Sequence, residues 1–502
     1  MRSWAAAAPC LALVLLTGYQ PGLPGGARLP LPSRTLDPRF GIAEGFRRPS
    51  VLTDLGAGWE RVVLSWADIQ PDGPDDFSWL GRTAPATGLL SDARAGVELV
   101  GLLQFTPTWA QRDPANGERS VPRNLDLPFD DPDNYWGRFV YQTARFYVGQ
   151  IDDWIVWNEP EFRPGDPGAG GSYTWLGTDQ EFAQLMKVAY LAIKKANPRA
   201  VVSFPGTSYW VDQAAGRPQF YDRYLSIIDA DPEAAEHNHY HDAVSLNLYR
   251  TPDDLVRVHS LFQDIQQRHG IDKPQWLLEL NAMPTDDRQI PCADRQAASP
   301  FKTSMDQQAA YAVQAFALAA GAGYQRMGFY QMVDDNPCNQ PAVWGITRDD
   351  GSSRPVADAL RTTFTWLSGY TSARFAPLTR TQKRWPVGPD DPTSFIPNWQ
   401  VYEVALDQPH GRRVTVLWNG DGSVLRVRLT RQGVRGRLVD RSGLGRPVAP
   451  QGEDWVLDLP AATAHFATDP PGYHFIGGEP LLLVEDGVAP DAPVTPPRLD
   501  GR

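Results

Sequence analysis

Short apolar runs alternate with segments of helical periodicity between residues 40 and 370. The apolar runs, several of them rich in β-branched residues, predict eight strands: Phe40–Ala43, Glu60–Ser65, Val97–Leu103, Ile151–Trp157, Ala200–Phe204, Ala243–Leu248, Gln275–Leu280 and Arg326–Met332. Eight strands that each alternate with a helical segment are typical of a closed barrel rather than an open doubly wound sheet. We therefore predict an α/β fold in which residues 37–370 form a (β/α)8 TIM barrel.

Three segments carry the clearest helical patterns. In Glu181–Lys195 the apolar residues recur at helical spacing, and Thr178 with Glu181 has the sequence of a capping box. Tyr135–Val148 also has one apolar stripe. Ala309–Ala320 is apolar on nearly all sides, as expected for a helix enclosed between the barrel and its neighbours.

Beyond Tyr370 the pattern changes to short strands separated by turn residues. The predicted strands are Val401–Leu406, Arg413–Trp418, Val424–Leu429, Arg437–Asp440, Trp455–Leu459 and Pro480–Val484. Asn419-Gly420, between the second and third of these, predicts a hairpin turn. We predict a small C-terminal β-sandwich over residues 371–488, followed by a disordered tail, residues 489–502, rich in Pro and Asp.

The N-terminus has the layout of an export signal. Arg2 precedes an apolar run from Trp4 to Thr17, and turn-forming residues follow as far as Gly26, which predicts a signal peptide over residues 1–27. An uncleaved N-terminal anchor is the alternative. We therefore expect a secreted protein, in which an oxidising compartment permits a disulfide between Cys292 and Cys338, with two free thiols as the alternative.

Composition and motifs restrict the function classes. The 47 Lys and Arg against 59 Asp and Glu give a net charge of −12, which argues against a nucleic-acid partner. No GxGxxG or Walker sequence follows a predicted strand, so neither nucleotide-binding signature is present. No apolar stretch reaches the roughly 18 residues of a transmembrane helix, and we expect no membrane span in the mature chain.

Two glutamates stand at the ends of predicted strands. Trp157-Asn158-Glu159-Pro160 closes the fourth strand, and Glu279 lies near the end of the seventh. The carboxyl ends of the strands form the active face of a TIM barrel, so both side chains are expected at one opening. A carboxylate in an apolar strand is costly to bury unless it is paired or used. Glycosidic bond cleavage uses such a pair, one carboxyl protonated and one ionised.

These two motifs together resemble the clan A retaining glycoside hydrolases, the 4/7 superfamily. The β-xylosidase/α-iduronidase and cellulase-like families look most similar. The resemblance implies that Glu159 is the acid/base, that Glu279 is the nucleophile and that Asn158 binds the sugar 2-hydroxyl. It also implies that Arg61 keeps the nucleophile ionised and that Tyr249 hydrogen-bonds to it. The eighth strand lacks the tryptophan that many members have there, which leaves the substrate open.

Further residues are candidates for the site. Trp109, Tyr330 and Trp344 could contact the sugar, although a tryptophan in a loop is as often part of the core; Trp66 is a similar case. Glu161 competes with Glu159 as the acid, but it follows the proline and is expected to point away. Asp334 and Asp335 are at the correct end to line the cleft.

Three histidines at alternate positions, His237, His239 and His241, raise the question of a metal. They precede the sixth strand and so belong to the face opposite the chemistry, where we expect a loop without a metal.

The sequence thus predicts a secreted retaining glycosidase that needs no metal or organic cofactor. Its partner would be a glycoside, oligosaccharide or polysaccharide, cleaved through a covalent glycosyl-enzyme. A non-catalytic carbohydrate-binding barrel and a transglycosylase using the same residues are the alternatives. The sequence leaves open the sugar, the linkage and endo or exo action, and the sandwich is expected to brace the barrel.

Overall fold

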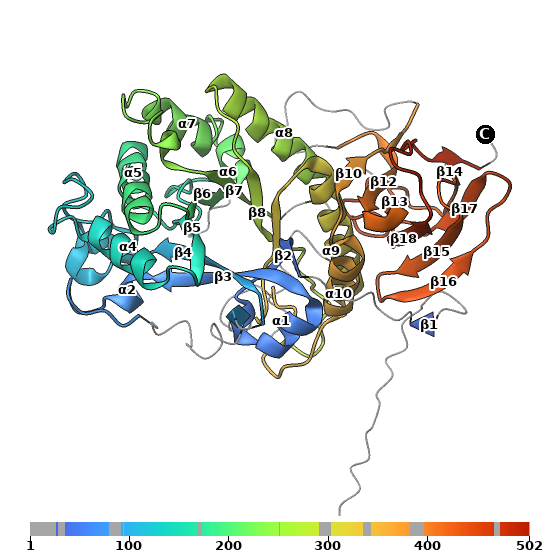
Figure 1. Cartoon of the computed structure of the whole chain (residues 1–502), viewed down its shortest axis with the longest axis horizontal. Coiled ribbons are helices and arrows are strands. Elements are labelled where there is room, and N and C mark those ends of the chain that lie inside the picture. The colour runs from blue at the N-terminus through green and yellow to red at the C-terminus, as the bar shows by residue number, and fades with distance from the viewer. Residues whose placement is uncertain are drawn as a thin grey trace, which may run out of the picture.

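The chain folds into a parallel barrel followed by a smaller antiparallel domain (Figure 1). The computed structural model describes residues 27–28, 36–79, 92–93, 95–167, 173–249, 251–290, 303–334, 343–381, 396–465 and 472–500. The barrel strands are β2 (Asp37–Ala43), β3 (Ala57–Ser65), β4 (Glu98–Gln104), β5 (Ile151–Val156), β6 (Val201–Thr207), β7 (Ala243–Leu248), β8 (Gln275–Leu280) and β9 (Arg326–Phe329). β2 closes the ring by pairing with β9. The predicted (β/α)8 barrel is confirmed, strand by strand.

Helices cover the outside of the barrel. They are α1 (Pro49–Leu55), α2 (Trp66–Ile69), α4 (Tyr135–Phe146), α5 (Asp179–Ala196), α6 (Tyr209–Ala214), α7 (Phe220–Ile228), α8 (Asp253–Arg268), α9 (Met305–Ala322) and α10 (Pro355–Leu367). The predicted capping box is present at α5. Thr178 Oγ1 accepts a hydrogen bond from the Glu181 N–H at 3.1 Å, and the Glu181 carboxylate accepts one from the Thr178 N–H at 2.8 Å.

The interior of the barrel is filled by large side chains that need small neighbours. Trp59 on β3 is fully buried among residues of the barrel interior. A Cβ on Gly41 of β2 would lie 2.2 Å from the Trp59 ring, and one on Gly328 of β9 would lie 2.7 Å from it. The two glycines therefore make room for one indole, and the barrel is a packed core whose chemistry is left to the strand ends.

The C-terminal domain is built from two antiparallel sheets. The larger contains, in spatial order, β1 (Ala27–Arg28), β16 (Leu444–Val448), β15 (Arg435–Asp440), β18 (Leu481–Asp486), β13 (Arg412–Asn419), β12 (Trp399–Gln408) and β10 (Ser372–Phe375), with β11 (Leu378–Thr379) also on β12. The smaller contains β17 (Asp454–Leu459), β14 (Leu425–Thr430) and β19 (Arg498–Leu499). One apolar cluster, including Leu417, Val427 and Trp455, joins them, so the predicted sandwich is confirmed.

The predicted hairpin at Asn419-Gly420 is wrong. β13 pairs with β12 and β18, whereas β14 pairs with β17 and β19, so this segment crosses from one sheet to the other. The buried Asn419 side chain shapes the crossover: its Nδ2 donates to the Ser423 carbonyl at 2.7 Å, and its Oδ1 accepts from the Asp421 N–H at 2.7 Å. Asn-Gly is a turn sequence, and a turn can join strands of different sheets.

The expectation of a disordered tail is also wrong for its described part, which ends at residue 500. Arg498 and Leu499 pair with Arg428 and Val427 of β14. The buried Arg413 guanidinium donates to the carbonyls of Ala492 and Pro493 at 2.7 and 3.0 Å. At the other end, residues 1–26 of the predicted signal peptide lie outside the described residues, and Ala27 pairs with Gly445 of β16.

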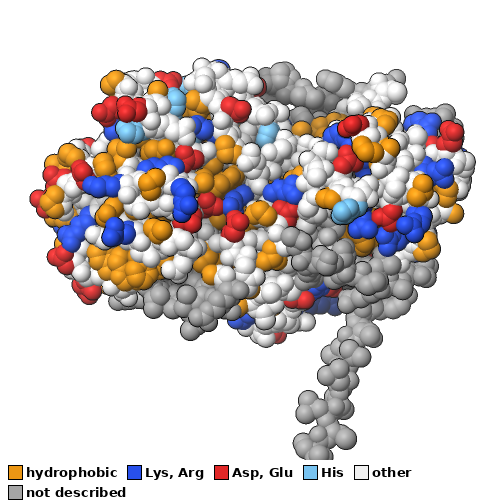
Figure 2. All heavy atoms as spheres, in the orientation of Figure 1, with side chains coloured by type: hydrophobic (Ala, Val, Ile, Leu, Met, Phe, Trp, Pro, Cys, Tyr) orange, Lys and Arg blue, Asp and Glu red, His pale blue; other side chains and the backbone are white. Residues whose placement is uncertain are grey.

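Helices α9 and α10 lie between the barrel and the sandwich (Figure 1). α9 is buried from Gln308 to Ala320, which confirms the enclosed helix predicted at Ala309–Ala320. Its Gln314 side chain donates to the Gly478 carbonyl and accepts from the Gly477 N–H, at 2.9 and 3.0 Å. On the face shown in Figure 2, acidic and basic side chains are interspersed. Within the described ranges, no helix is both long enough and apolar enough to cross a membrane.

Candidate active site

Glu159 follows β5 in a sharply twisted segment. The φ angles of Trp157 and Glu159 are +69° and +45°, a region that residues other than glycine adopt at an energetic cost. Thr174 holds this backbone from outside, because its hydroxyl donates to the carbonyls of Asn158 and Glu159. The Glu159 N–H donates to the Gly206 carbonyl of β6 at 2.9 Å. The strained turn thus places Asn158 and Glu159 beside the neighbouring strands.

Asn247 of β7 holds both of these side chains. Its Nδ2 donates to Glu159 Oε1 at 3.0 Å and to Asn158 Oδ1 at 3.2 Å. A Cβ on Gly206 would lie 2.4 Å from Asn247 Oδ1, so the glycine makes room for the amide. Asn247 was not among the residues predicted for the site. The signal was available, since Asn247 precedes Tyr249 by two positions and alternate residues of a strand share a face.

The Glu279 carboxylate on β8 accepts hydrogen bonds from β3 and from the residue that follows β7. Arg61 Nη1, from β3, bonds Oε1, and the hydroxyl of Tyr249, which directly follows β7, bonds Oε2. Both Glu279 and Arg61 are buried, at 5% and 3% exposure. A guanidinium and a hydroxyl on the two oxygens satisfy a buried carboxylate and hold its orientation. The two contacts expected from the family resemblance, from Arg61 and Tyr249, are therefore present.

The charge of Glu279 acts on the carboxyl group of Glu159. Burial, and next the negative charge of Glu279, raise the pKa of Glu159 to about 7, although the hydrogen bond from Asn247 and the charge of Arg61 act in the opposite direction. A carboxyl with this pKa is substantially protonated near neutral pH. The site therefore contains one carboxyl able to donate a proton and a second that faces a permanent cation.

Aromatic side chains border the pair. The ring centre of Tyr249 lies 6.1 Å from that of Tyr330 and 5.0 Å from that of Trp344. The Arg61 guanidinium carbon lies 5.7 Å from the centre of the Tyr330 ring. All three rings are partly exposed, so each presents aromatic surface near Glu279. The structure thus brings Tyr330 and Trp344 to the site.

Trp109, in the loop after β4, has packing partners of its own. Its indole N–H donates to the Gln70 carbonyl at 2.7 Å, and its ring packs edge-on against Trp66 and Tyr135. Trp66 itself is fully buried. These contacts place Trp109 in the packing beside α2 and α4.

Two other acidic candidates have partners of their own. Glu161 is buried and accepts from the N–H and the hydroxyl of Ser208, at 2.6 and 3.1 Å, so it is bonded away from Glu279. Asp334 does not line the cleft as expected, because it is fully buried in an ion pair with Arg354 at 2.7 Å. Asp335 and the predicted disulfide partners Cys292 and Cys338 lie outside the described residues.

The three histidines precede β7, as predicted. His241 is buried, and its Nε2 and Nδ1 lie 2.8 Å from the Tyr221 hydroxyl and from the His239 carbonyl. Its ring is thus part of the packing. In the part of the chain that the structure describes, no three His, Cys, Asp or Glu residues are grouped to hold a metal ion.

No protein-family model matches the chain, and no curated protein matches it significantly. Solved structures match over most of its length. One is a family 39 glycoside hydrolase from Bacteroides cellulosilyticus WH2, with 14% identity and a TM-score of 0.62 over 91% of this chain and 83% of that one. The chain shares its fold. The catalytic domain of a GH30 xylanase C from Talaromyces cellulolyticus (12% identity, TM-score 0.54, 90% and 97% covered) and a monomeric β-xylosidase from Caulobacter crescentus CB15 (15%, 0.51, 92% and 98%) are similar too. The sequence resemblance is confirmed at the level of fold.

Proposed function

We propose that this protein is a retaining glycoside hydrolase. The observation that carries the proposal is that Glu159, which follows β5, and Glu279 on β8 lie in one polar cluster, in which the charge of Glu279 raises the pKa of Glu159. The fold shared with glycoside hydrolases of families 39 and 30 supports it. The mechanism needs no metal or organic cofactor.

In the first step, Glu279 attacks the anomeric carbon and the glycosidic bond breaks. Arg61 and Tyr249 hold the attacking carboxylate, and Glu159 gives its proton to the departing oxygen. Asn158, held by Asn247, is placed to bond the sugar 2-hydroxyl, a contact that strengthens in the transition state. The products are a glycosyl ester on Glu279 and the free leaving group.

In the second step, Glu159 acts as the base. Once Glu279 is esterified its negative charge is gone, so a cause that raises the pKa of Glu159 disappears and the carboxylate form is favoured. Glu159 takes a proton from water, the oxygen attacks the anomeric carbon, and the ester bond to Glu279 breaks. Two displacements return the original anomeric configuration.

Retention requires the two carboxyl groups to lie about 5–5.5 Å apart. The effect of the Glu279 charge on the pKa of Glu159 supports a short separation. For the substrate we propose a β-xyloside or β-glucoside, since the similar structures include a β-xylosidase, a xylanase and a glucosidase from Croceicoccus marinus. Secretion rests on the N-terminal sequence and is part of the same proposal.

The decisive experiment uses p-nitrophenyl β-xyloside and β-glucoside with the wild type, Glu159→Gln, Glu279→Gln and Glu161→Gln. Glu161 is the matched control, since it is a buried glutamate two residues from Glu159 that bonds Ser208. We expect losses of roughly a thousandfold or more in the first two variants and a small effect in the third. Equal background hydrolysis in all four proteins would favour a non-catalytic binding protein.

Two further measurements define the chemistry. Proton NMR of the first product anomer should show retained configuration, and a 2-deoxy-2-fluoro glycoside should label Glu279 in mass spectrometry. An inverted product would contradict the double displacement. Adding acceptor sugars distinguishes hydrolysis from transglycosylation by the products formed.

A further inference from the structure

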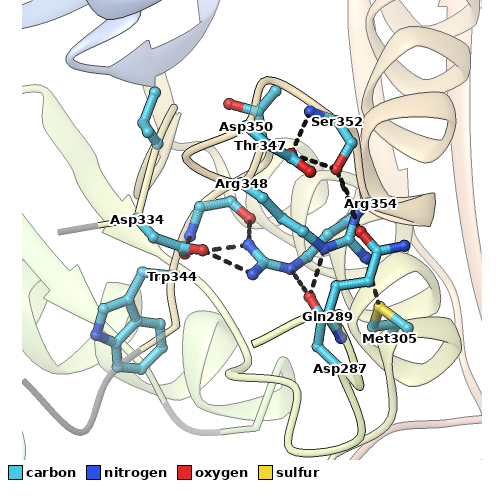
Figure 3. A network of polar contacts seen from close by, with 12 residues as sticks. Asp287, Gln289, Met305, Asp334, Trp344, Thr347, Arg348, Asp350, Ser352 and Arg354 are labelled. Carbon is cyan, nitrogen blue, oxygen red and sulfur yellow. Dashed lines mark hydrogen bonds and ion pairs between the residues drawn. The ribbon is translucent and has the colours of Figure 1, made fainter. Parts of the chain in front are cut away.

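The loops that follow β8 and β9 are joined by a buried network of ion pairs (Figure 3). Arg354, directly before α10, donates through Nε to Asp287 at 2.8 Å and through Nη2 to Asp334 at 2.7 Å. Arg348 adds a second bond to Asp287, also at 2.8 Å. The side chains of Arg354, Asp287 and Asp334 are all 0% exposed. We call these four residues the arginine clamp.

Two buried guanidinium groups and two buried carboxylates balance in charge. Burial alone would raise the pKa of Asp287, but hydrogen bonds from Arg348 and Arg354 outweigh this and leave the pKa below its ordinary value. Removing one member leaves an uncompensated buried charge, so the geometry of the clamp is strongly constrained. Because the guanidinium fork of Arg354 bonds both aspartates, its position fixes one loop against the other.

The clamp hydrogen-bonds to the backbone of Gly345, next to Trp344. Asp334 Oδ1 accepts from the Gly345 N–H at 2.7 Å, and Arg354 Nη1 donates to the Gly345 carbonyl. A Cβ on Gly345 would lie 2.7 Å from Asp334 Oδ1 and 2.4 Å from the Thr347 carbonyl oxygen. Only glycine fits this close approach, so the peptide groups on either side of Gly345 are held by carboxylate and guanidinium together.

A second set of bonds ties the same segment to the nucleophile's strand. The Trp344 carbonyl accepts from the Gln331 N–H at 3.1 Å and from Asn281 Nδ2 at 2.9 Å. Asn281 stands two residues after Glu279. The Trp344 ring, in turn, lies beside Tyr249, which bonds Glu279. The backbone of Trp344 is therefore held in place, and its indole ring lies beside the tyrosine that bonds Glu279.

We propose that Arg354 is a positioning residue that acts through Asp334 and Gly345 to hold Trp344 as an aromatic wall against the sugar. This rests on the proposed glycosidase function. Trp344 then takes the place of the tryptophan that the eighth strand lacks. The position of the loop that carries Trp344 is determined by the ion pairs of the clamp and not by a strand. Arg354 itself does not touch the substrate.

A double-mutant cycle tests this route. The variants are Arg354→Lys, Trp344→Ala and the double variant, measured by kcat/KM on the aryl glycoside that the wild type cleaves best. Lysine keeps the charge but loses the fork. We expect Arg354→Lys to lower kcat/KM about tenfold in the wild type and less than about twofold when Trp344 is absent, because coupled residues are non-additive.

The matched control is Arg413→Lys in the sandwich. Arg413 is also buried and also bonds an aspartate and backbone carbonyls, those of Asp407, Ala492 and Pro493. The Arg413→Lys substitution should lower the melting temperature and leave kcat/KM of the folded protein unchanged. If Arg354→Lys does not fold, Gly345→Ala keeps all four clamp side chains but displaces the backbone beside Trp344, because its Cβ would clash with Asp334 and the Thr347 carbonyl. Its loss of kcat/KM should likewise disappear in the Trp344→Ala background.

The outcomes separate the two proposals. If hydrolysis depends on Glu279 but the effects of Arg354→Lys and Trp344→Ala multiply, the positioning role is overturned and the glycosidase stands. If the wild type shows no Glu279-dependent hydrolysis, the proposed function fails and this inference fails with it. A non-additive loss of kcat/KM in the double variant, with kcat/KM of Arg413→Lys unchanged, supports both the glycosidase function and the positioning role.

Discussion

Glu159 and Glu161 are two residues apart, yet their surroundings differ: Glu161 is fully buried, whereas Glu159 is partly exposed. Glu159 accepts a hydrogen bond from Asn247, and the charge of Glu279 raises its pKa. Glu161 accepts hydrogen bonds from the N–H and the hydroxyl of Ser208. The proline between them and the left-handed φ of Glu159 turn the chain within this short segment. At the scale of a residue, the role follows from the partners that surround a side chain more than from its type.

The pH dependence of catalysis should report Glu159. Its pKa is about 7, and the mechanism needs it protonated in the free enzyme, so kcat/KM should fall as the pH rises past about 7. The measurement is a profile of kcat/KM from pH 4 to 9 with a p-nitrophenyl glycoside. A dinitrophenyl glycoside, whose leaving group needs little protonation, is the control and should show a weaker alkaline decline. An alkaline limit that persists unchanged in Glu159→Gln would contradict the assignment.

Asn247 should influence both the rate and this pH profile. Its hydrogen bond lowers the pKa of Glu159, so Asn247→Ala should move the alkaline limit to higher pH. It should also lower kcat/KM by about ten- to a hundredfold, because Asn158 and Glu159 lose their shared donor. Kinetics across pH measure both effects. A lowered rate with an unmoved limit would mean that Asn247 affects only packing.

The site residues at the ends of strands could be predicted from the sequence, whereas the prediction for Asp334 was wrong. Glu159, Glu279 and Tyr249 could be placed because the carboxyl ends of barrel strands meet at one opening. Asp334 looked equivalent, but its partner Arg354 comes from the start of α10, a contact that no periodicity reveals. Buried ion pairs between loops depend on tertiary packing and are therefore not readable from local pattern.

At the scale of elements, strand positions were more predictable than strand partners. Alternating apolar residues marked β13 and β14 correctly, yet the same alternation fits a hairpin and a crossover equally well. β19 was missed because it is two residues long and lies in a Pro-rich segment, where its pairing with β14 depends on the rest of the sandwich. Short edge strands are fixed by their neighbours.

Helix ends were predictable where a cap is encoded locally, and α5 offers a test. Thr178→Ala removes the side chain that accepts from the Glu181 N–H, so we expect a loss of about 1 kcal/mol in the free energy of unfolding. Urea denaturation measures it. Ser260→Ala, which removes an exposed hydroxyl within α8, is the control and should change stability by less than about 0.5 kcal/mol. Equal effects of the two substitutions would show that the cap contributes nothing.

At the scale of the molecule, the sandwich contacts the loop that carries Tyr249. Thr251 Oγ1 donates to the Phe475 carbonyl at 2.9 Å. Next to it, Asp253 at the start of α8 accepts from the hydroxyls of Tyr402 and Tyr473, at 3.0 and 3.1 Å. The barrel therefore presents a buried carboxyl to two phenols of the other domain. This arrangement supports a bracing role, because the bonds end two and four residues after a site residue.

Asp253 should make the stability of the whole molecule depend on pH. Burial raises the pKa of Asp253 from 3.8 to about 7, against the hydrogen bonds from Tyr402 and Tyr473, which lower it. A carboxyl with a raised pKa in the folded state contributes stability that is present below the unfolded pKa and is lost as the pH rises through the folded one. The free energy of unfolding should therefore decline between about pH 4 and 7. Asp253→Asn stays neutral and keeps an oxygen for the phenols, so its advantage over the wild type should grow across this range to on the order of 4 kcal/mol.

Thermal or urea unfolding of both proteins from pH 4 to 8 measures this difference. Asp231→Asn supplies a control of opposite sign, because hydrogen bonds and the charge of Lys187 leave the pKa of Asp231 lowered despite its burial. That variant should be less stable than the wild type at neutral pH, and the gap should close in acid. Parallel stability curves for the wild type and Asp253→Asn would mean that Asp253 does not take up a proton on folding. The pH response of the domain contact would then have to come from another group, such as Glu479, whose pKa burial also raises to about 7.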